Sequence, residues 1–384
     1  MNGSLKINKS DLRIFLFLFP FFEPWWFTRI GILDNLYDLL KLSVCFLILI
    51  RILQNKVKIS SFAKIYMAYR LFICGVSLCR GVFDIGYLSE SIQFISLFIL
   101  IEYLIKSYGK RVLKIICIIF SIILFINIIT YTPNGIIFEP KGFYLLGIRT
   151  RVAELAIPAI ALTLFYCKSF NKGKLTLLIV LVSALSFFVF EWVATALTCT
   201  LFFFGILSLE KIIHKKFKQK YYGVLIFIVV ACSLGVVFFN IQETFSDLIE
   251  KYLNKSVTLT GRTDLWEIAI DVVKEKWICG YGFKNQGDFV SMYDFTTTSH
   301  NQWLQTMFYG GAIGSILYYL LPLLSINKCI KESKYNKTVG ILLIGLATII
   351  IMCTTEICMD NAYYLTFIIC MYNCKEFYSY GKSK

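Results

Sequence analysis

The sequence predicts an all-α protein, a helical bundle that crosses a membrane many times. Three observations support this fold class. The chain of 384 residues is 58% hydrophobic and only 16% charged, whereas about a quarter of the residues in a typical soluble domain are charged. The apolar residues form repeated runs of about 18 to 23 residues, the length that an α-helix needs to cross a bilayer. Short loops rich in Lys and Arg separate these runs, without the ten-residue alternation of a membrane β-barrel.

The apolar runs predict about twelve spans in a single transmembrane domain over residues 1–384. We place the spans, in order, at 13–28, 32–51, 62–80, 85–105, 112–131, 148–167, 175–190, 192–209, 221–240, 303–324, 338–358 and 361–374. With the N-terminus in the cytoplasm, the basic clusters of the inner loops all fall on one side of the membrane. Both termini are then cytoplasmic, and the long loop 241–302, between the ninth and tenth spans, is extracytoplasmic.

The overall composition argues against several other classes of protein. The net charge is +15, but the bases lie in short loops rather than along one face, so they indicate topology and not binding to nucleic acid. Most of the thirteen cysteines lie inside apolar runs, where Cys packs as a small apolar residue, so we expect neither a disulfide framework nor a metal site. No motif predicts a cofactor. The first apolar run lacks a small-residue cleavage site, which predicts a retained helix rather than a signal peptide.

The extracytoplasmic loop 241–302 is the one long polar stretch, with nine acidic and six basic residues. Within it, apolar residues recur at spacings of three and four over 264–277 and predict an amphipathic helix. Arg262, after Gly261, would lie just before the N-terminus of this helix. There its guanidinium and the free backbone N–H groups can face one anion, for example a diphosphate.

His300 and Asn301 follow a Ser/Thr run at the head of the tenth span. Histidine has an unperturbed pKa that suits proton transfer near neutral pH, and an Asn beside it can orient a substrate. The alternative interpretation is an interfacial histidine that hydrogen-bonds to a loop carbonyl. We keep His300 as the candidate base.

A second outer loop ends in Arg149 and Arg151, on the side of the membrane where positive charge is disfavoured. These arginines could extend to lipid phosphates. Alternatively they form an anion site that faces the bundle interior, because ionisable groups at membrane depth usually mark a ligand or a pathway. Glu154, one turn further along the predicted helix, could pair with either arginine and hold its guanidinium.

Several short motifs have a joint spacing that is more informative than any one of them. They are Gly261-Arg262 with Trp266, Gly280-x-Gly282, His300-Asn301-x-x-Leu304 and Gly311-x-x-Gly314. Together they resemble the signature of the O-antigen ligase and polysaccharide polymerase family of bacterial envelope enzymes. The strong part of the resemblance covers about 50 residues, and the layout of spans with one large outer loop extends it along the chain.

This resemblance implies a GT-C-like, metal-independent, hexosyltransferase-type glycosyltransferase in the bacterial plasma (inner) membrane, with its active site on the extracytoplasmic face. The donor would be an oligosaccharide on undecaprenyl diphosphate, and a chain-length regulator and a flippase of the same pathway would be partners. Arg262, Arg149 and Arg151 would bind the diphosphate, and His300 would engage or deprotonate the acceptor. The sequence departs from the family pattern at Ala194, where an Arg is usual, and at Cys279, where a Pro is usual.

Three functions remain open on these residues. The first is a polymerase that joins O-antigen or capsule repeat units by attack of a sugar hydroxyl, with inversion at the anomeric centre. The second is a ligase that transfers finished glycan to a lipid A core. The third is a non-enzymatic transporter of lipid-linked glycan, although no repeated pair of interrupted helices supports it.

Overall fold

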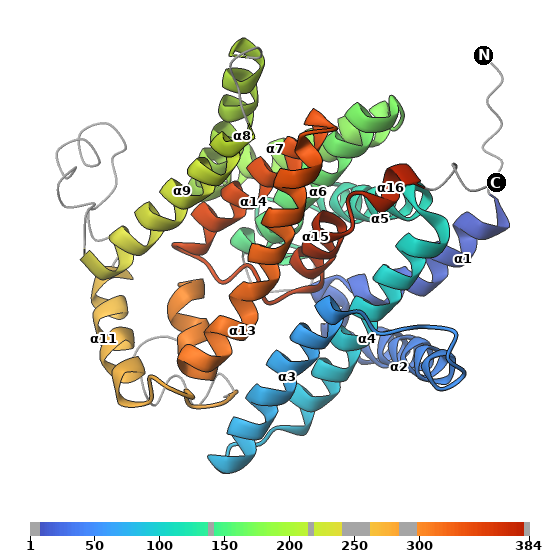
Figure 1. The fold of residues 1–384 in the computed structure, drawn as a ribbon. Helices are drawn as coiled ribbons and strands as arrows, with labels where there is room; N and C mark the ends of the chain where they lie inside the picture. The colour runs from blue at the N-terminus through green and yellow to red at the C-terminus, as the bar shows by residue number, and fades with distance from the viewer. Residues whose placement is uncertain (1–7, 137–141, 214–218, 240–261, 284–297, 380–384) are drawn as a thin grey trace.

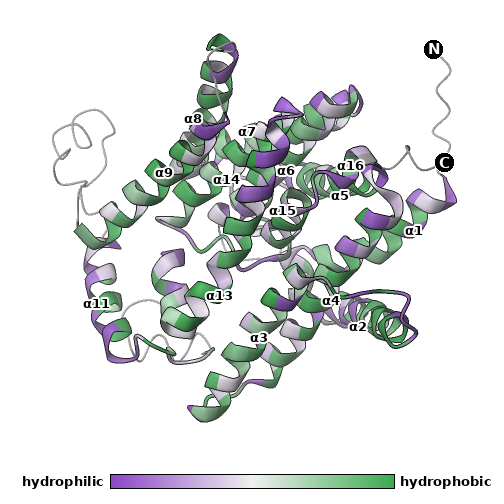
Figure 2. Cartoon of the chain, viewed as in Figure 1, coloured by the Kyte–Doolittle hydropathy of each residue, from purple (hydrophilic) through white to green (hydrophobic). Residues whose placement is uncertain are grey.

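The computed structural model describes residues 8–136, 142–213, 219–239, 262–283 and 298–379. It confirms the all-α fold class, because the described chain is a bundle of packed helices (Figure 1). Hydrophobic residues cover most of these helices, whereas α11 (Arg262–Glu275) has a large hydrophilic share (Figure 2). Seven described helices are long and apolar enough to cross a membrane, and three more apolar helices are shorter.

The elements follow the predicted spans closely. The first half comprises α1 (Lys9–Leu18), η1 (Phe19–Phe22), η2 (Trp25–Arg29), α2 (Gly31–Leu53), α3 (Ser61–Cys79), α4 (Ile85–Tyr108), α5 (Lys110–Ile129), β1 (Phe143–Tyr144), β2 (Gly147–Ile148) and α6 (Arg149–Phe170). The second half comprises α7 (Lys174–Phe190), α8 (Ala194–Ile212), α9 (Lys220–Phe239), α11, α13 (Gln302–Ser333), η4 (Lys337–Val339), α14 (Gly340–Cys353), α15 (Ala362–Tyr372) and α16 (Glu376–Ser379). The strands β1 and β2 form a short antiparallel hairpin in which Phe143 pairs with Ile148.

The first predicted span, 13–28, is wrong as a continuous helix. The α-helix ends at Leu18, and two short 3₁₀ turns follow it. Pro20 cannot donate the backbone hydrogen bond that a continuing helix needs, and Pro24 holds the preceding Glu23 in an extended conformation. Glu23 instead forms an ion pair of 2.6 Å with Lys41 of α2.

The core is centred on α6, which packs against α5, α7, α14 and α15. Small residues allow this close packing: a Cβ atom placed on Gly345 of α14 would lie only 2.7 Å from the Cβ of Ala161 in α6. Van der Waals packing at such small-residue contacts holds helices together in a bilayer, where lipid removes most of the hydrophobic driving force. The core therefore fixes α14 and α15 against the start of α6.

A kink divides α13 into two helices at Gly311, which has φ of +55°. The segment after α11 lies against this kink: the backbone N–H of Tyr281 donates to the Phe308 carbonyl at 2.8 Å, and that of Ala312 donates to the Trp277 carbonyl at 2.7 Å. Gly280, with φ of +73°, has no room for a side chain, because a Cβ there would lie 2.6 Å from the Phe308 carbonyl oxygen. The Gly-x-Gly and Gly-x-x-Gly motifs thus join α11 to the first half of α13.

Candidate functional site

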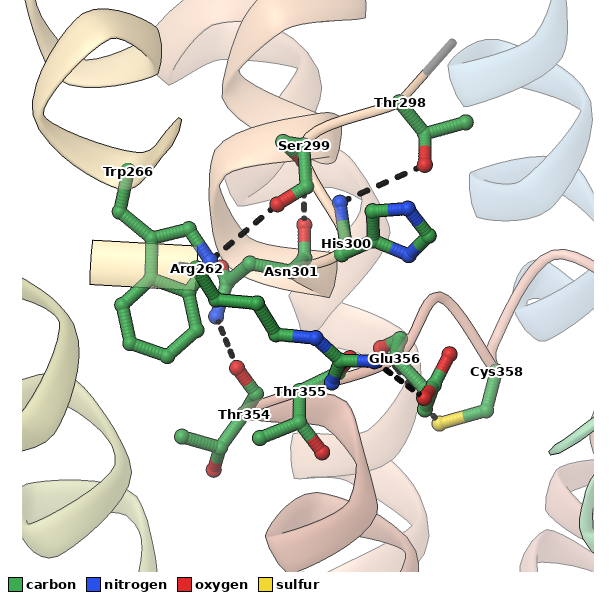
Figure 3. Close-up of polar contacts among 10 residues, drawn as sticks. All are labelled: Arg262, Trp266, Thr298, Ser299, His300, Asn301, Thr354, Thr355, Glu356 and Cys358. Atoms are coloured by element: carbon green, nitrogen blue, oxygen red, sulfur yellow. Dashed lines mark hydrogen bonds and ion pairs between the residues drawn. The ribbon is translucent and has the colours of Figure 1, made fainter. Parts of the chain in front are cut away.

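The site is centred on residues 354–361, which connect α14 to α15. At a rise of about 1.5 Å per residue, α14 and α15 are each shorter than the hydrocarbon core of roughly 30 Å. Cys358 and Met359 of the connection are buried. Non-helical backbone at such depth is tolerated where protein covers it or where it lines a cavity. In the connection 354–361, backbone carbonyls and the Glu356 carboxylate meet residues of α11 and of the segment that leads into α13 (Figure 3).

Arg262 is the first residue of α11 and binds the connection 354–361 directly. Its Nη2 forms an ion pair of 2.9 Å with Glu356 Oε1, and its Nη1 donates to the Thr355 carbonyl. A cation is favourable there because the last carbonyls of α14 lack helical partners and carry the negative end of the helix dipole. A quarter of the Arg262 side chain remains exposed. The guanidinium is thus held in one orientation while part of it stays accessible.

Trp266 connects the next turn of α11 to the segment that carries His300. Its indole Nε1 donates to the Ser299 carbonyl at 3.2 Å. The Ser299 hydroxyl in turn donates to the Asn301 carbonyl at 2.9 Å (Figure 3). Trp266 is almost fully buried, so this contact fixes the position of the 299–301 backbone relative to Arg262.

Asn301 is fully buried, and both the oxygen and the nitrogen of its side-chain amide form hydrogen bonds. Its Oδ1 accepts from the Leu304 N–H at 2.9 Å, which caps α13, and its Nδ2 donates to the Thr354 carbonyl at 2.8 Å. Side-chain capping of this kind satisfies helix ends that water cannot reach. The geometry assigns Asn301 a positioning role: it joins the start of α13 to the end of α14, with His300 directly before it.

His300 adopts a left-handed backbone conformation with φ of +47°, an arrangement that is uncommon for a residue with a side chain and often occurs at functional sites. Its backbone N–H lies 3.4 Å from the Thr298 hydroxyl. Within the described residues, neither imidazole nitrogen has a hydrogen-bond partner. Burial lowers the pKa of His300 below 6.5; the Glu356 carboxylate opposes this effect, and the Arg262 cation adds to it. The imidazole is therefore neutral at neutral pH.

Gln302 and Asp360 extend the polar network beneath His300. Gln302 Oε1 accepts from the Met359 N–H at 2.9 Å, and its Nε2 approaches Asp360 Oδ2 at 3.4 Å. Burial is the main cause of a raised pKa at Asp360, and the Arg70 cation opposes it. These contacts connect the start of α13 to the far end of the connection 354–361.

Glu154 does not form the ion pair with an arginine that the sequence suggested, as far as the described residues show. Its Oε2 accepts from Asn361 Nδ2 at 3.0 Å, which connects α6 to the connection 354–361. Arg151 still lies close enough for its charge to act on Glu154, as expected three residues apart on a helix.

Arg149 and Arg151 are both exposed at the start of α6, and neither has an ion pair within the described part of the chain. They face different surroundings. Arg151 lies beside Gly147 and acts on Glu154, on the side of the connection 354–361, whereas the charge of Arg149 acts on the hydroxyl of Tyr144 in the β1–β2 hairpin. The structure thus separates two residues that the sequence treated alike.

The principal feature that sequence reasoning missed is Glu356. The predicted span 338–358 placed it inside an apolar helix, but α14 ends at Cys353. The side chain of Asn361 caps α15 by accepting from the Tyr364 N–H at 2.9 Å, so the chain between the two helices is free to turn. The cluster Thr354, Thr355, Glu356, Asp360 and Asn361 was the available signal, because polar residues inside an apolar run usually mark a site.

Two further predictions concern residues that lie wholly or largely outside the described part of the chain. Gly261 lies outside the described residues, as does most of the predicted extracytoplasmic loop 241–302. The predicted helix 264–277 is present as α11 and begins slightly earlier, at Arg262. Among the described residues, no group of three His, Cys, Asp or Glu side chains could hold a metal ion.

Comparison with known proteins adds one finding. Residues 192–319 match the O-antigen ligase family. This match covers less than half of the chain, so it is a similarity of this region to that family. The matched region runs from the start of α8 to the second half of α13, and so includes Arg262, Trp266, His300 and Asn301. Neither the curated proteins nor the solved structures contain a match.

Proposed function

We propose that this protein is a polysaccharide polymerase. It transfers an O-antigen or capsule repeat unit from undecaprenyl diphosphate to a sugar hydroxyl of a second lipid-linked unit, on the extracytoplasmic face of the plasma membrane. One observation carries the proposal: a partly exposed Arg262, held by Glu356 and the Thr355 carbonyl, lies close enough to His300 for its charge to act on that neutral imidazole. A fixed cation and a neutral base are the two groups that this transfer needs.

The donor diphosphate would lie against Arg262. A guanidinium offers paired N–H donors to phosphate oxygens, and a donor that is already fixed stabilises developing charge without reorganising. The Thr355 hydroxyl is buried and has no hydrogen-bond partner within the described residues, so it can donate to the same group. Arg151, exposed on the neighbouring α6, would supply the second cation.

In the reaction, the acceptor hydroxyl oxygen attacks the anomeric carbon and forms the new glycosidic bond. The bond between that carbon and the diphosphate oxygen breaks, and its electron pair stays on the diphosphate. Attack from the opposite face inverts the anomeric centre. His300 accepts the proton of the hydroxyl, a contribution of about 10²–10⁴-fold to the rate.

The fixed backbone of His300 supports its role as the base. His300 has a left-handed backbone conformation, and both of its neighbours are fixed. Trp266 binds the Ser299 carbonyl, and Asn301 caps α13. Strain of this kind, about 1–3 kcal/mol, persists where surrounding contacts over-determine it. Burial keeps the imidazole unprotonated, and only the unprotonated form can accept a proton.

A ligase that transfers glycan to a lipid A core is the second candidate. The observation that favours it is the description of the matched family, O-antigen ligase. Both functions use the same donor and the same chemistry at the anomeric carbon, and they differ in the acceptor. The acceptor therefore distinguishes them.

The test uses the full chain, purified and reconstituted in lipid, with undecaprenyl-diphosphate oligosaccharide as donor. We expect released undecaprenyl diphosphate and products of two or more repeat units. Glycan transfer that occurs only to added lipid A core would instead establish the ligase. No turnover with either acceptor would favour the transporter.

His300→Ala should lower the rate of transfer by about 10²–10⁴-fold and leave donor affinity within about twofold of wild type. Single-turnover rates and donor binding are both measured. An unchanged turnover number would exclude His300 as the base, and loss of donor binding would assign it to the donor site instead.

A further inference from the structure

A concave feature outside the candidate site lies in the N-terminal part of the bundle. It is a small pocket of about 50 Å³ between α1, α2 and α4 that opens to its surroundings. The segment that follows α11 lies near the start of α4, where Tyr87 stacks on Phe283 with a ring separation of 4.1 Å. The pocket is lined by Tyr103 of the same helix, sixteen residues later, which at the helical rise is about 24 Å away. The pocket is thus distinct from the candidate site.

One side of the pocket is apolar. Its lining includes Phe17 of α1, Leu47 and Ile48 of α2, and Leu100 of α4. Leu47 is 44% exposed and Phe46 beside it is 62% exposed, so this wall continues onto the outer apolar face of α2. In a membrane-spanning bundle such a face contacts acyl chains.

The other side of the pocket is cationic. Arg13 of α1 and Arg51 of α2 both line it. Arg51 Nη1 donates to the Tyr103 hydroxyl oxygen at 2.8 Å, and its guanidinium carbon lies 5.6 Å from the centre of the same ring. Because the Tyr103 oxygen accepts this bond, its own O–H can donate to a ligand.

In the described part of the chain, no carboxylate forms an ion pair with either of these two arginines. The pocket lining contains no Asp or Glu, and neither arginine has an ion pair within the described residues. The nearest acids on the same elements bind elsewhere: Asp11 pairs with Lys114 at 2.8 Å, and Glu102 accepts from the Ser60 hydroxyl at 2.5 Å. Two unpaired cations beside an apolar wall complement an anion that carries a hydrocarbon chain.

We propose that this pocket binds an anionic phospholipid of the surrounding membrane. The phosphate lies between Arg13 and Arg51 and accepts from Tyr103, and one acyl chain follows the apolar wall along α2. Basic pockets between transmembrane helices recognise anionic headgroups in this way. The phospholipid joins α1 to α2, which connect through the 3₁₀ turns η1 and η2 rather than through a continuous helix. It therefore stabilises the N-terminal part of the bundle.

The experiment measures lipid retention by native mass spectrometry and thermal unfolding of the full chain in detergent. The probes are phosphatidylglycerol and phosphatidylcholine with the same acyl chains. We expect wild type to retain phosphatidylglycerol in preference and to unfold at higher temperature with it. Arg13→Gln/Arg51→Gln should weaken retention by about tenfold or more, because charge-assisted hydrogen bonds to the phosphate are lost.

The matched control is Lys64→Gln/Lys211→Gln, which removes two exposed bases that lie outside the pocket. It should retain phosphatidylglycerol like wild type. If the double variant unfolds, Arg13→Gln alone is used, because Arg13 is exposed and its substitution leaves the core intact. Equal retention of both lipids by wild type, or equal losses in the pocket and control variants, would overturn the proposal. Glycan transfer by the same variants is measured separately, so the lipid-binding result does not depend on the proposed function.

Discussion

The two arginine-bearing regions of the candidate site are built in opposite ways. Arg262 is fixed by Glu356 and by the end of α14, and only part of its side chain is exposed. Arg149 and Arg151 are exposed at the start of α6, and neither has an ion pair within the described residues. A fixed cation is suited to the charge that develops as a bond breaks, whereas an unpaired cation can adapt to the rest of a bulky anion. The difference predicts unequal responses to substitution.

Arg262→Lys should give the largest effect among the arginine substitutions. A lysine has one compact charge and cannot bind Glu356, the Thr355 carbonyl and a phosphate with a planar fork. We expect the turnover number of the reconstituted enzyme to fall by about 10²–10³-fold. Arg80→Lys, at an exposed arginine directly after α3, is the control and should remain near wild type. A similarly small fall in the turnover number of both variants would show that Arg262 does not bind the donor.

Arg151→Gln should have an intermediate effect and a larger one than Arg149→Gln. Arg151 lies three residues before Glu154 on α6, and its charge acts on that carboxyl group. Loss of one charge-assisted hydrogen bond to the donor should weaken its binding by roughly tenfold to a hundredfold. Donor affinity measured for both variants tests the comparison directly, because the charge change is identical. A larger loss in Arg149→Gln would reverse the assignment and place the second cation at the β1–β2 hairpin.

Glu356→Gln should have the smallest effect on the maximal rate and a distinct effect on its pH dependence. Gln keeps an oxygen for Arg262, so we expect the maximal rate to fall by about tenfold or less. The Glu356 charge raises the pKa of His300 against the effect of burial. Without that charge the pKa falls further, so His300 stays neutral to lower pH. The acidic limb of the kcat/KM profile should therefore move to lower pH.

The control for this shift is Glu267→Gln, on the exposed side of α11. Its pH profile should match that of wild type. If the acidic limb of Glu356→Gln stayed in place or moved to higher pH, the group that titrates would not be His300.

Some of the candidate site was predictable from local sequence signals. Apolar runs and basic loops locate the helices, because backbone in hydrocarbon must satisfy its hydrogen bonds within each segment. The three- and four-residue spacing after Arg262 predicts α11, and the glycine motifs mark positions where backbone approaches backbone. These signals require only neighbours along the chain. By the same logic, Pro20 and Pro24 could have shown that α1 ends early.

The sequence by itself determined the helical membrane fold, the order of its elements and the similarity of residues 192–319 to the O-antigen ligase family. Only the tertiary structure decided that Glu356 holds Arg262 and that Asn301 joins two helix ends. The reason is physical: an ion pair between residues 94 positions apart depends on how α11, α13 and α14 pack. Hydropathy along the sequence indicates which residues are buried in the membrane or the protein core. It does not indicate which distant side chain each of them contacts.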